Sequence, residues 1–171
     1  MRASRYFRFP PGANINYMSN LNWQLLSFDQ LDVNLLYALL RLRTEVFVVE
    51  QNCVFQDMDN KDQQCHHLLG WEGKQLVAYT RLVPPGVSYS EPSIGRVVTS
   101  PAARGNGLGR VLMDKSIEEA NKLFGDLPIR IGAQLYLRRF YESLGFMQSS
   151  EIYDEDGIDH IEMLRQPGFL V

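Results

Sequence analysis

Residues 101–110 read PAARGNGLGR and carry the strongest structural signal in the chain. They follow an apolar β-type run and precede a segment whose apolar residues recur at helical spacing. Three glycines in five residues, Gly105, Gly107 and Gly109, let the backbone turn tightly and bring its N–H groups close to a ligand. An anion at this place would also meet the positive end of the following helix dipole. The stretch therefore predicts a loop that binds a phosphate-bearing cofactor.

The spacing of these glycines differs from that of two common phosphate-binding motifs. A dinucleotide-binding Rossmann motif requires G-x-G-x-x-G, whereas the spacing here is G-x-G-x-G. A P-loop requires Gly-Lys-Ser/Thr after its glycines, and Arg110 with Val111 does not supply that sequence. A glycine-rich turn that binds nothing stays open, because glycines commonly mark tight turns.

Two sequence blocks resemble the GNAT superfamily of N-acetyltransferases. Arg104–Gly109 matches the superfamily's (Gln/Arg)-x-x-Gly-x-(Gly/Ala) loop, and Phe140–Phe146, with the sequence FYESLGF, looks like its second block. The blocks stand in the right order and at the right distance, so the resemblance covers nearly all of the chain. It implies an α/β GNAT fold with a mixed central sheet of about six or seven strands, splayed in a V and flanked by about four helices.

A further segment, Arg43–Cys53, resembles the R-x-x-V-F-V-x-E-Q element of the ElaA-like acetyltransferases, the subgroup that the chain resembles most. The acidic run that follows, QDMDNKD at residues 56–62, is expected to be a loop because Asp and Asn favour turns. It is interpreted either as a solvated loop or as a wall of carboxylates that attracts a cationic amine. Arg43 and Arg81 could hold a substrate carboxylate or tether a loop.

The resemblance implies direct transfer of an acetyl group from acetyl-CoA to a primary amine of a small molecule or peptide. In this superfamily the backbone of the central strand binds the pantetheine arm, the glycine loop binds the phosphates, and an Asn often stands where this chain has Gln134. The residues implied in acetyl-CoA binding are therefore Val97, Val98, Thr99, Arg104, Gly105, Asn106, Gly107, Leu108, Gly109, Arg110 and Gln134.

Tyr141 stands where the superfamily usually places the tyrosine that protonates the departing CoA thiolate. The alternative is an aromatic side chain that only packs against the closing hairpin. The residue that takes the proton from the amine stays open.

Ribosomal-protein alanine acetyltransferases carry a glutamate as base on the strand before the second block, and this chain has Ile129 at the matching position. The remaining candidates for the base are Glu50, His66 or His67, and His160. A strand histidine is more often a structural group, although histidine is suited to taking a proton near neutral pH.

The rest of the sequence predicts a single α/β domain. Alternating or continuous apolar runs predict strands, helical periodicity predicts helices, and Asp156-Gly157 predicts a hairpin turn. Strands are expected at Asn22–Phe28, His67–Trp71, Gln75–Val83, Ser93–Thr99, Ile129–Gln134, Met147–Tyr153 and Ile158–Arg165, and helices from Asp29 or Asp32 towards Val49, at Gly107–Phe124 and at Leu135–Leu144. Residues 1–20 are expected to form a flexible extension, and residues 21–171 one GNAT domain.

Composition and charge limit the kinds of partner that we expect for this chain. The chain has 171 residues and a net charge of −3, which gives no basic field for nucleic acid. It contains no long apolar span that predicts a membrane helix and no signal peptide, so a cytoplasmic location is expected. Cys53 and Cys65 lack the spacing of a zinc site and are expected to be free thiols, without metal. A homodimer is possible, as many members of the superfamily pair through sheet edges.

Two other functions stay open. One is a non-catalytic acyl-CoA-binding module that keeps the glycine loop but not the chemistry. The other is an acyltransferase like the acyl-homoserine-lactone synthases, which Arg43–Phe47, the acidic loop, Thr80–Pro84 and Ile94–Arg96 resemble in order. Those synthases generally lack an RGNGLG loop followed by FYESLGF.

Overall fold

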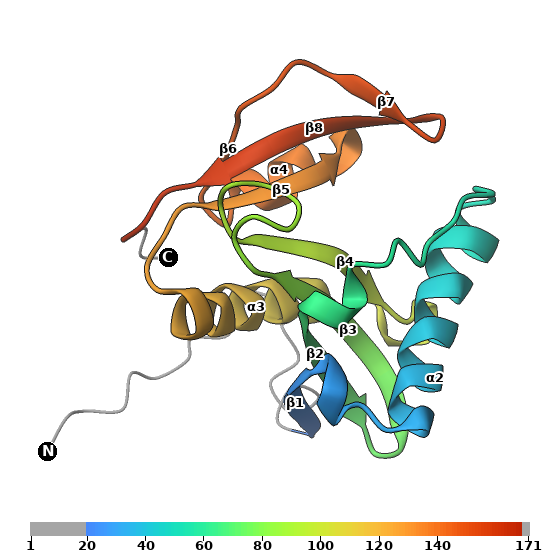
Figure 1. Ribbon diagram of the computed structural model, residues 1–171. Coiled ribbons are helices and arrows are strands. Elements are labelled where there is room, and N and C mark those ends of the chain that lie inside the picture. The colour runs from blue at the N-terminus through green and yellow to red at the C-terminus, as the bar shows by residue number, and fades with distance from the viewer. Residues whose placement is uncertain (1–19, 169–171) are drawn as a thin grey trace, which may run out of the picture.

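The protein is described by a computed structural model, which defines residues 20–168 (Figure 1). The strands are β1 (Leu21–Ser27), β2 (His66–Glu72), β3 (Gln75–Val83), β4 (Ser93–Thr99), β5 (Ile129–Gln134), β6 (Phe146–Gln148), β7 (Tyr153–Glu155) and β8 (Ile158–Arg165). The α-helices are α2 (Val33–Arg43), α3 (Leu108–Phe124) and α4 (Arg138–Glu142). A π-helical segment, η2 (Thr44–Glu50), continues α2. The flexible extension predicted for residues 1–20 lies outside the described residues, apart from Asn20.

All eight of these strands belong to one mixed sheet with the order β1-β2-β3-β4-β5-β8-β6, and β7 pairs with β8. β4 and β5 run parallel and share one register pair, Ser93 with Arg130, whereas β5 and β8 pair along six residues. Beyond that pair the two halves of the sheet separate, as Figure 1 shows for β4 below and β5 with β8 above. The predicted GNAT fold with a V-shaped opening is therefore confirmed.

The sheet has one strand more than the upper number expected, because the predicted strand Met147–Tyr153 divides. β6 ends at Gln148 and β7 begins at Tyr153, with irregular backbone between them. Asp156 and Gly157 then turn the chain into β8 with φ values of 54° and 82°. Two consecutive left-handed residues are the geometry of a tight hairpin turn, so the Asp-Gly prediction is confirmed.

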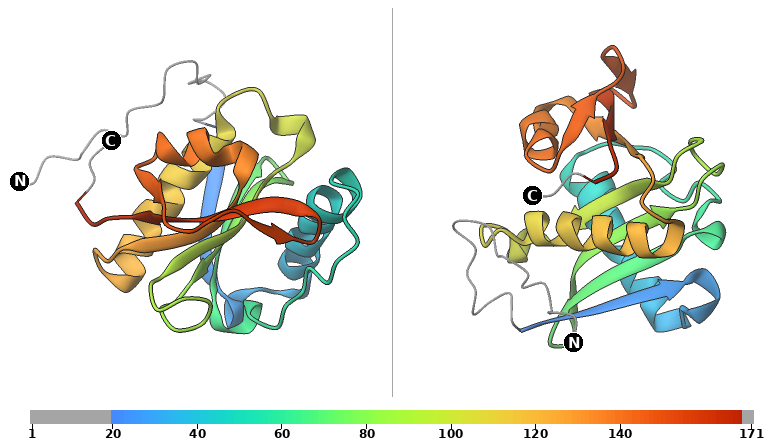
Figure 2. Two further views of the ribbon diagram at one scale, coloured as in Figure 1. Left: turned by 90° about the horizontal axis from the view of Figure 1, so that it is seen from above. Right: turned by 90° about the vertical axis from the view of Figure 1, so that its left-hand side faces the viewer.

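Helices α2 and α3 cover opposite faces of the sheet, and neighbouring residues of β2 show why. Leu68 packs with residues of α3, including Leu112, whereas Leu69 packs with residues of α2, including Leu39. Successive strand side chains point to opposite faces, so both faces of this half of the sheet are buried. The two helices flank the sheet in Figure 2.

The ends of the helices follow from local chemistry. Asp32 Oδ1 accepts hydrogen bonds from the amides of Asn34 at 2.8 Å and Leu35 at 2.9 Å, so α2 begins after Asp32 and not after Asp29. Gly107 precedes α3 with a φ of 78°, and Gly125 follows it with a φ of 89°. Both values lie in the left-handed region that favours glycine. The predicted helix Leu135–Leu144 is shorter in the structure, where a 3₁₀ turn precedes α4.

β4 contains a bulge. Tyr79 of β3 pairs with Val98, and Arg81 pairs with Gly95, so Thr80 opposes two residues of β4. One of those two, Arg96, has a φ of 50°. A bulge interrupts the ladder and leaves backbone groups unpaired, here at the point where β4 begins to diverge from β5.

Candidate functional site

A cavity of about 910 Å³ lies in the opening between the two halves of the sheet. β4 and β5 form its floor, and η2, the start of α4, the glycine loop and the β7–β8 turn surround it. Among the predicted site residues, the cavity is lined by Glu50, Val97, Val98, Thr99, Arg104, Gly109, Gln134, Tyr141 and His160. The structure therefore brings these residues together, whereas the other predicted cofactor-binding residues do not line the cavity, namely Gly105, Asn106, Gly107, Leu108 and Arg110.

The free edge of β4 forms one side of the cavity. Val97, Val98 and Thr99 follow the bulge and line the cavity, although the side chain of Val98 packs in the core with Tyr79. Within the described chain, β5 pairs with β4 at Ser93 alone. The backbone N–H and C=O groups that β4 directs towards β5 beyond that point therefore have no strand partner and are available to a ligand.

The glycine loop has room for a ligand against its backbone. Gly105 and Gly107 have φ values of 88° and 78°, and Gly109 is the second residue of α3. A Cβ built at Gly105 or Gly109 meets no atom within 4 Å, so neither glycine is required by packing against the protein itself. Asn106 is half-buried at the loop.

Two loop residues direct their side chains elsewhere. Leu108 is 1% exposed and packs in the core. Arg110 Nη1 donates to Ser143 Oγ at 2.8 Å and Nε to Asp114 at 3.3 Å, which fixes the start of α3 to the end of α4. Both residues can therefore contribute to cofactor binding mainly through their backbone, and a direct role of the Arg110 guanidinium is not supported.

Arg104 and Glu50 form an ion pair at the edge of the cavity. Arg104 Nη2 donates to Glu50 Oε2 at 2.8 Å and also to the carbonyl oxygen of Thr99 at 3.3 Å. The hydrogen bond from Arg104 lowers the pKa of Glu50. A carboxylate held in this way is a weak proton acceptor, so the arrangement disfavours Glu50 as the general base.

Tyr141 lines the cavity from α4 while only 6% of its surface is exposed. Its ring packs edge-on against Phe140 and Phe146, with centroids 5.1 Å and 6.0 Å away. Burial is the main cause that raises the pKa of the phenol, and the neighbouring phenol of Tyr136 adds to the rise. The hydroxyl therefore stays protonated at neutral pH and can donate a hydrogen bond.

His160 lines the cavity from β8, opposite Gln134 in the register of β5 and β8. Its Nδ1 lies 2.8 Å from the carbonyl oxygen of Ile158. A carbonyl can only accept, so Nδ1 carries the proton and the neutral ring keeps its lone pair on Nε2. The ring stacks on Tyr153 with centroids 5.9 Å apart, which fixes its plane.

Gln134 and Gln51 bridge the two halves of the cavity. Gln134 Nε2 at the end of β5 donates to Gln51 Oε1 at the end of η2, at 3.3 Å. The end of η2 also lies beside the β7–β8 turn (Figures 1 and 2), where Cys53 Sγ donates to the carbonyl oxygen of Asp156 at 3.5 Å. Gln51 is the last residue of the R-x-x-V-F-V-x-E-Q element, but it was not among the predicted site residues, because the element alone assigns it no role.

The other two histidines do not lie at the cavity. His67 is fully buried, with Nε2 3.1 Å from the carbonyl oxygen of Asp62 and Nδ1 2.8 Å from the hydroxyl of Tyr79. Burial lowers the pKa of His67, so the neutral ring donates to the carbonyl and accepts from the tyrosine. His66 packs edge-on against Phe124 of α3. Neither is placed to act as the base.

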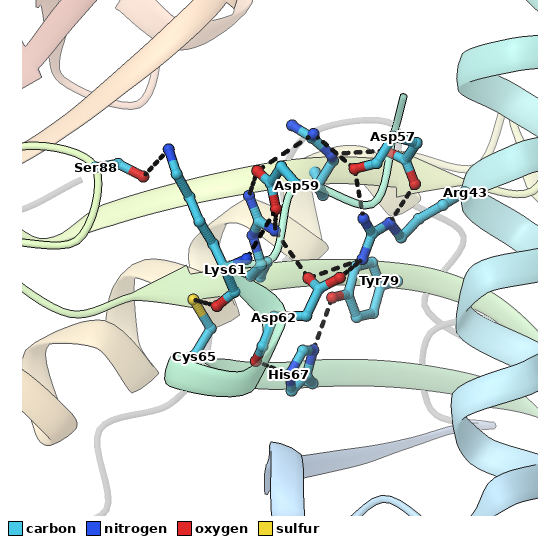
Figure 3. A network of polar contacts seen from close by, with 11 residues as sticks. Arg43, Asp57, Asp59, Lys61, Asp62, Cys65, His67, Tyr79 and Ser88 are labelled. Atoms are coloured by element: carbon cyan, nitrogen blue, oxygen red, sulfur yellow. Dashed lines mark hydrogen bonds and ion pairs between the residues drawn. The ribbon is translucent and has the colours of Figure 1, made fainter. Parts of the chain in front are cut away.

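The acidic loop is held by a buried network of three arginines and three aspartates (Figure 3). Arg43, which is fully buried, donates from Nε to Asp57 at 2.8 Å and from Nη1 to Asp62 at 2.9 Å. Burial alone would raise the pKa of Asp62, but the charges of Arg43 and Arg81 and their hydrogen bonds outweigh it, and the pKa is lowered.

The sheet supplies the other two arginines of this network. Arg81 of β3 binds both oxygens of Asp59 at 2.7 Å, and Arg96 of the β4 bulge donates to Asp57 at 2.7 Å. The interpretation of the loop as a wall of carboxylates that attracts a cation is therefore wrong, because arginines neutralise these carboxylates. Arg43 and Arg81 tether the loop, which is one of the two roles predicted for them.

Comparison with known proteins agrees with this geometry. Residues 33–166 match the sequence family described as "Acetyltransferase (GNAT) domain". The chain is 45% identical to protein ElaA of Escherichia coli (strain K12) over 148 residues, which are 85% of this chain and 97% of that protein.

Two solved structures resemble the protein closely. The crystal structure of an acyl-CoA N-acyltransferase from Pseudomonas aeruginosa has a TM-score of 0.81 and 45% identity, and covers 85% of this chain and 99% of that one. The crystal structure of Escherichia coli ElaA has a TM-score of 0.81 and 44% identity, with the same coverage. None of the helices in residues 20–168 is long and apolar enough to cross a membrane.

Proposed function

The chain belongs to the acetyltransferase (GNAT) domain family and is an acyltransferase, and on that premise we propose that it transfers an acetyl group from acetyl-CoA to a primary amine. The observation that carries the proposal is the unpaired edge of β4 beside the glycine loop, both at one cavity. Acetyl-CoA has amide groups along its pantetheine arm and phosphates at its end. The amides suit the free strand edge, and the phosphates suit the glycine loop.

The chain offers a partner for each part of the donor. The N–H and C=O groups that β4 directs towards β5 near Val97 and Val98 suit the amides of the pantetheine arm, whereas the Thr99 carbonyl already accepts a bond from Arg104. The positive end of α3 and the open backbone at Gly105 and Gly109 suit the pyrophosphate. Arg104, at 41% exposure of its side chain, can turn from Glu50 to a phosphate, because an exposed ion pair is worth only about 0–1 kcal/mol.

Tyr141 is proposed as the donor to the departing sulfur. Its phenol lines the cavity, and its raised pKa keeps the proton on the oxygen until charge develops on the sulfur. The packing against Phe140 and Phe146 fixes the direction of the hydroxyl. Bulge backbone groups of β4 are proposed to stabilise the oxyanion that forms on the acetyl carbonyl.

His160 is proposed as the base. The bond from Nδ1 to the Ile158 carbonyl leaves the Nε2 lone pair available to take a proton from the amine, directly or through one water. The amine nitrogen then attacks the thioester carbon, the C–S bond breaks, and the sulfur leaves as the thiol after receiving a proton. Glu50 is the second candidate, and it has to leave Arg104 before it can act.

A cytoplasmic location is part of the proposal. It is supported by the two free thiols, Cys53 and Cys65, since free cysteines are typical of a reducing compartment. We also propose that the protein forms a homodimer through pairing of sheet edges.

The experiment that tests the function combines binding with turnover. Acetyl-CoA is expected to raise the melting temperature, and a panel of primary amines is expected to contain at least one that releases free CoA thiol. A rise in melting temperature without release of CoA thiol in the presence of any amine would favour the acyl-CoA-binding module. Activity that required S-adenosylmethionine and an acylated carrier protein would favour a lactone-synthase-like reaction. The absence of any rise would contradict the assignment of the glycine loop.

A further inference from the structure

We propose that Lys61 and Ser88, on one wall of the cavity, bind a carboxylate of the acceptor, so that the amine acetylated is that of an amino acid or a related carboxylated amine. The proposal rests on the proposed function, since it names the acceptor class of the same site. It starts from the charges that face the cavity.

Most charged residues of the cavity wall already have partners. Glu50 pairs with Arg104, and Asp59 pairs with Arg81 and Arg96. Lys61 also lines the cavity, and within residues 20–168 it takes part in none of the ion pairs. Its ammonium group is 3.3 Å from the hydroxyl of Ser88, a neutral partner. Lys61 is therefore a cation of this wall that has no anionic partner within the described residues.

The backbone of Lys61 is fixed. Its amide donates to Asp59 Oδ1 at 3.2 Å, and its carbonyl oxygen accepts a bond from Cys65 Sγ at 3.0 Å. Asp59 is itself held by Arg81 in the buried network. Figure 3 shows the Lys61 side chain leaving this network and extending towards Ser88. A cation whose main chain is anchored on both sides loses less entropy when it binds a ligand than one on a free loop.

The hydroxyl of Ser88 is a neutral donor next to this ammonium group. Ser88 and Tyr89 follow one another in the loop between β3 and β4, and both line the cavity. A Cβ at Gly132 would lie 3.3 Å from the hydroxyl of Tyr89 and 3.2 Å from that of Tyr153. The two phenols therefore converge over a glycine of β5, where a larger side chain would occupy the space beside them. Burial raises the pKa of both phenols, so both remain donors at neutral pH.

Acidic groups lie on the β7–β8 side of the cavity, where Glu155 is close enough to Tyr89 and Tyr153 to add to the rise in the pKa of both phenols. Glu155 and Asp156, from the β7–β8 turn, line the cavity together with His160, and neither carboxylate takes part in an ion pair within the described residues. The cavity therefore presents the Lys61 ammonium group and the Ser88 hydroxyl from two neighbouring loops, and carboxylates with the proposed base from the β7–β8 hairpin. An acceptor that carries both an amine and a carboxylate matches both walls, with the amine directed to His160.

A binding experiment tests this subsite without turnover. The melting temperature is measured with CoA and a panel of N-acetyl amino acids, each compared with its N-acetyl amino-acid amide, for wild type, Lys61→Gln and Lys74→Gln. Lys74 is an exposed lysine in the β2–β3 turn, outside the cavity, and serves as the matched control.

At least one free acid is expected to stabilise the wild type at concentrations about tenfold lower than its amide, because the amide lacks the charge that Lys61 binds. Lys61→Gln should remove that difference, and Lys74→Gln should keep it. Equal stabilisation by acids and amides, no stabilisation by any acid, or a difference that survives in Lys61→Gln would overturn the proposal.

A turnover assay on the matching amino acids and amino-acid amides separates the two proposals. Release of CoA thiol with equal kcat/KM for acids and amides would keep the acetyltransferase and overturn the carboxylate subsite. Selective binding of acids that depends on Lys61, without thiol release from any amine, would keep the subsite and contradict the transferase.

Discussion

Arg104 donates a hydrogen bond to Glu50 at 2.8 Å, so the residue expected to bind the cofactor phosphates holds a residue expected to take the proton. The bond lowers the pKa of Glu50 and raises that of Arg104. Both side chains are 41% exposed, so the pair can open when a phosphate replaces the carboxylate. Glu50 is better understood as the partner of Arg104 in the free protein than as the base.

The first prediction compares the two candidate bases. His160→Gln is expected to lower kcat/KM for the best amine about 100-fold, because it removes the lone pair on Nε2. Glu50→Gln is expected to change it less than about threefold, because Glu50 is engaged by Arg104. Steady-state kinetics over a range of pH check this. A large loss in Glu50→Gln with a normal His160→Gln enzyme would reverse the assignment.

The second prediction tests why Gly109 is a glycine. The position is helical and a Cβ there meets no atom, so Gly109→Ala should raise the free energy of unfolding of the ligand-free protein by about 0.5–1 kcal/mol. The same Cβ should weaken acetyl-CoA binding at least about tenfold, because the cofactor is proposed to approach the backbone at this position. Urea unfolding and thermal shift measure the two effects. Unchanged acetyl-CoA binding in Gly109→Ala would indicate that the glycine loop is only a structural turn.

The third prediction concerns the buried network. Arg43→Met leaves Asp57 and Asp62 without one of their cations, and should lower the free energy of unfolding by about 3–5 kcal/mol. Arg138→Met is the matched control, because Arg138 binds Glu142 at a similar 2.7 Å but is 50% exposed. It should cost no more than about 0.5 kcal/mol. Similar losses in the two variants in urea unfolding would contradict a structural role for the network.

The fourth prediction is a pH dependence. The pKa of Asp62 is lowered by Arg43 and Arg81 against the effect of burial, so the folded protein binds its proton less well than the unfolded chain. Its contribution to stability should be complete above the ordinary Asp pKa of ~3.9 and lost as the pH falls below it. The stability difference between wild type and Asp62→Asn should therefore narrow as the pH falls from about 4 towards the lowered pKa of folded Asp62. A difference that stays constant across that range would show that the Asp62 charge is not involved.

The fold could be predicted from the sequence because its signals are local. The boundaries of β3, β4, β5 and β8 and the start of α3 follow from apolar periodicity and from glycines with left-handed φ. Asp29 and Asp32 were equivalent as helix caps in the sequence, and only the backbone shows that Asp32 makes the bonds. The division of Met147–Tyr153 into two strands depends on pairing with β8, which no local pattern specifies.

Only those candidate site residues that lie in local motifs could be predicted from the sequence. Motif blocks indicated the glycine loop, Tyr141 and Gln134, all of which come with a distinctive spacing. The pairing of the acidic loop with Arg43, Arg81 and Arg96 was missed as a network, because residues that bond directly in it are up to 39 positions apart in the chain. Ser88 and Tyr89 were missed because they lie in an irregular loop, where neither periodicity nor motif marks a residue that faces a cavity.

The most direct test of the central proposal is thiol release from acetyl-CoA by wild type and Tyr141→Phe over a panel of primary amines, with thermal shift measured alongside. Tyr37→Phe, on the exposed face of α2, is the control. Tyr141→Phe is expected to keep the acetyl-CoA-induced shift and to lose about 100-fold in kcat, because it removes one hydroxyl and preserves the packing of the ring. Full activity in Tyr141→Phe, with normal cofactor binding, would contradict its role as the acid.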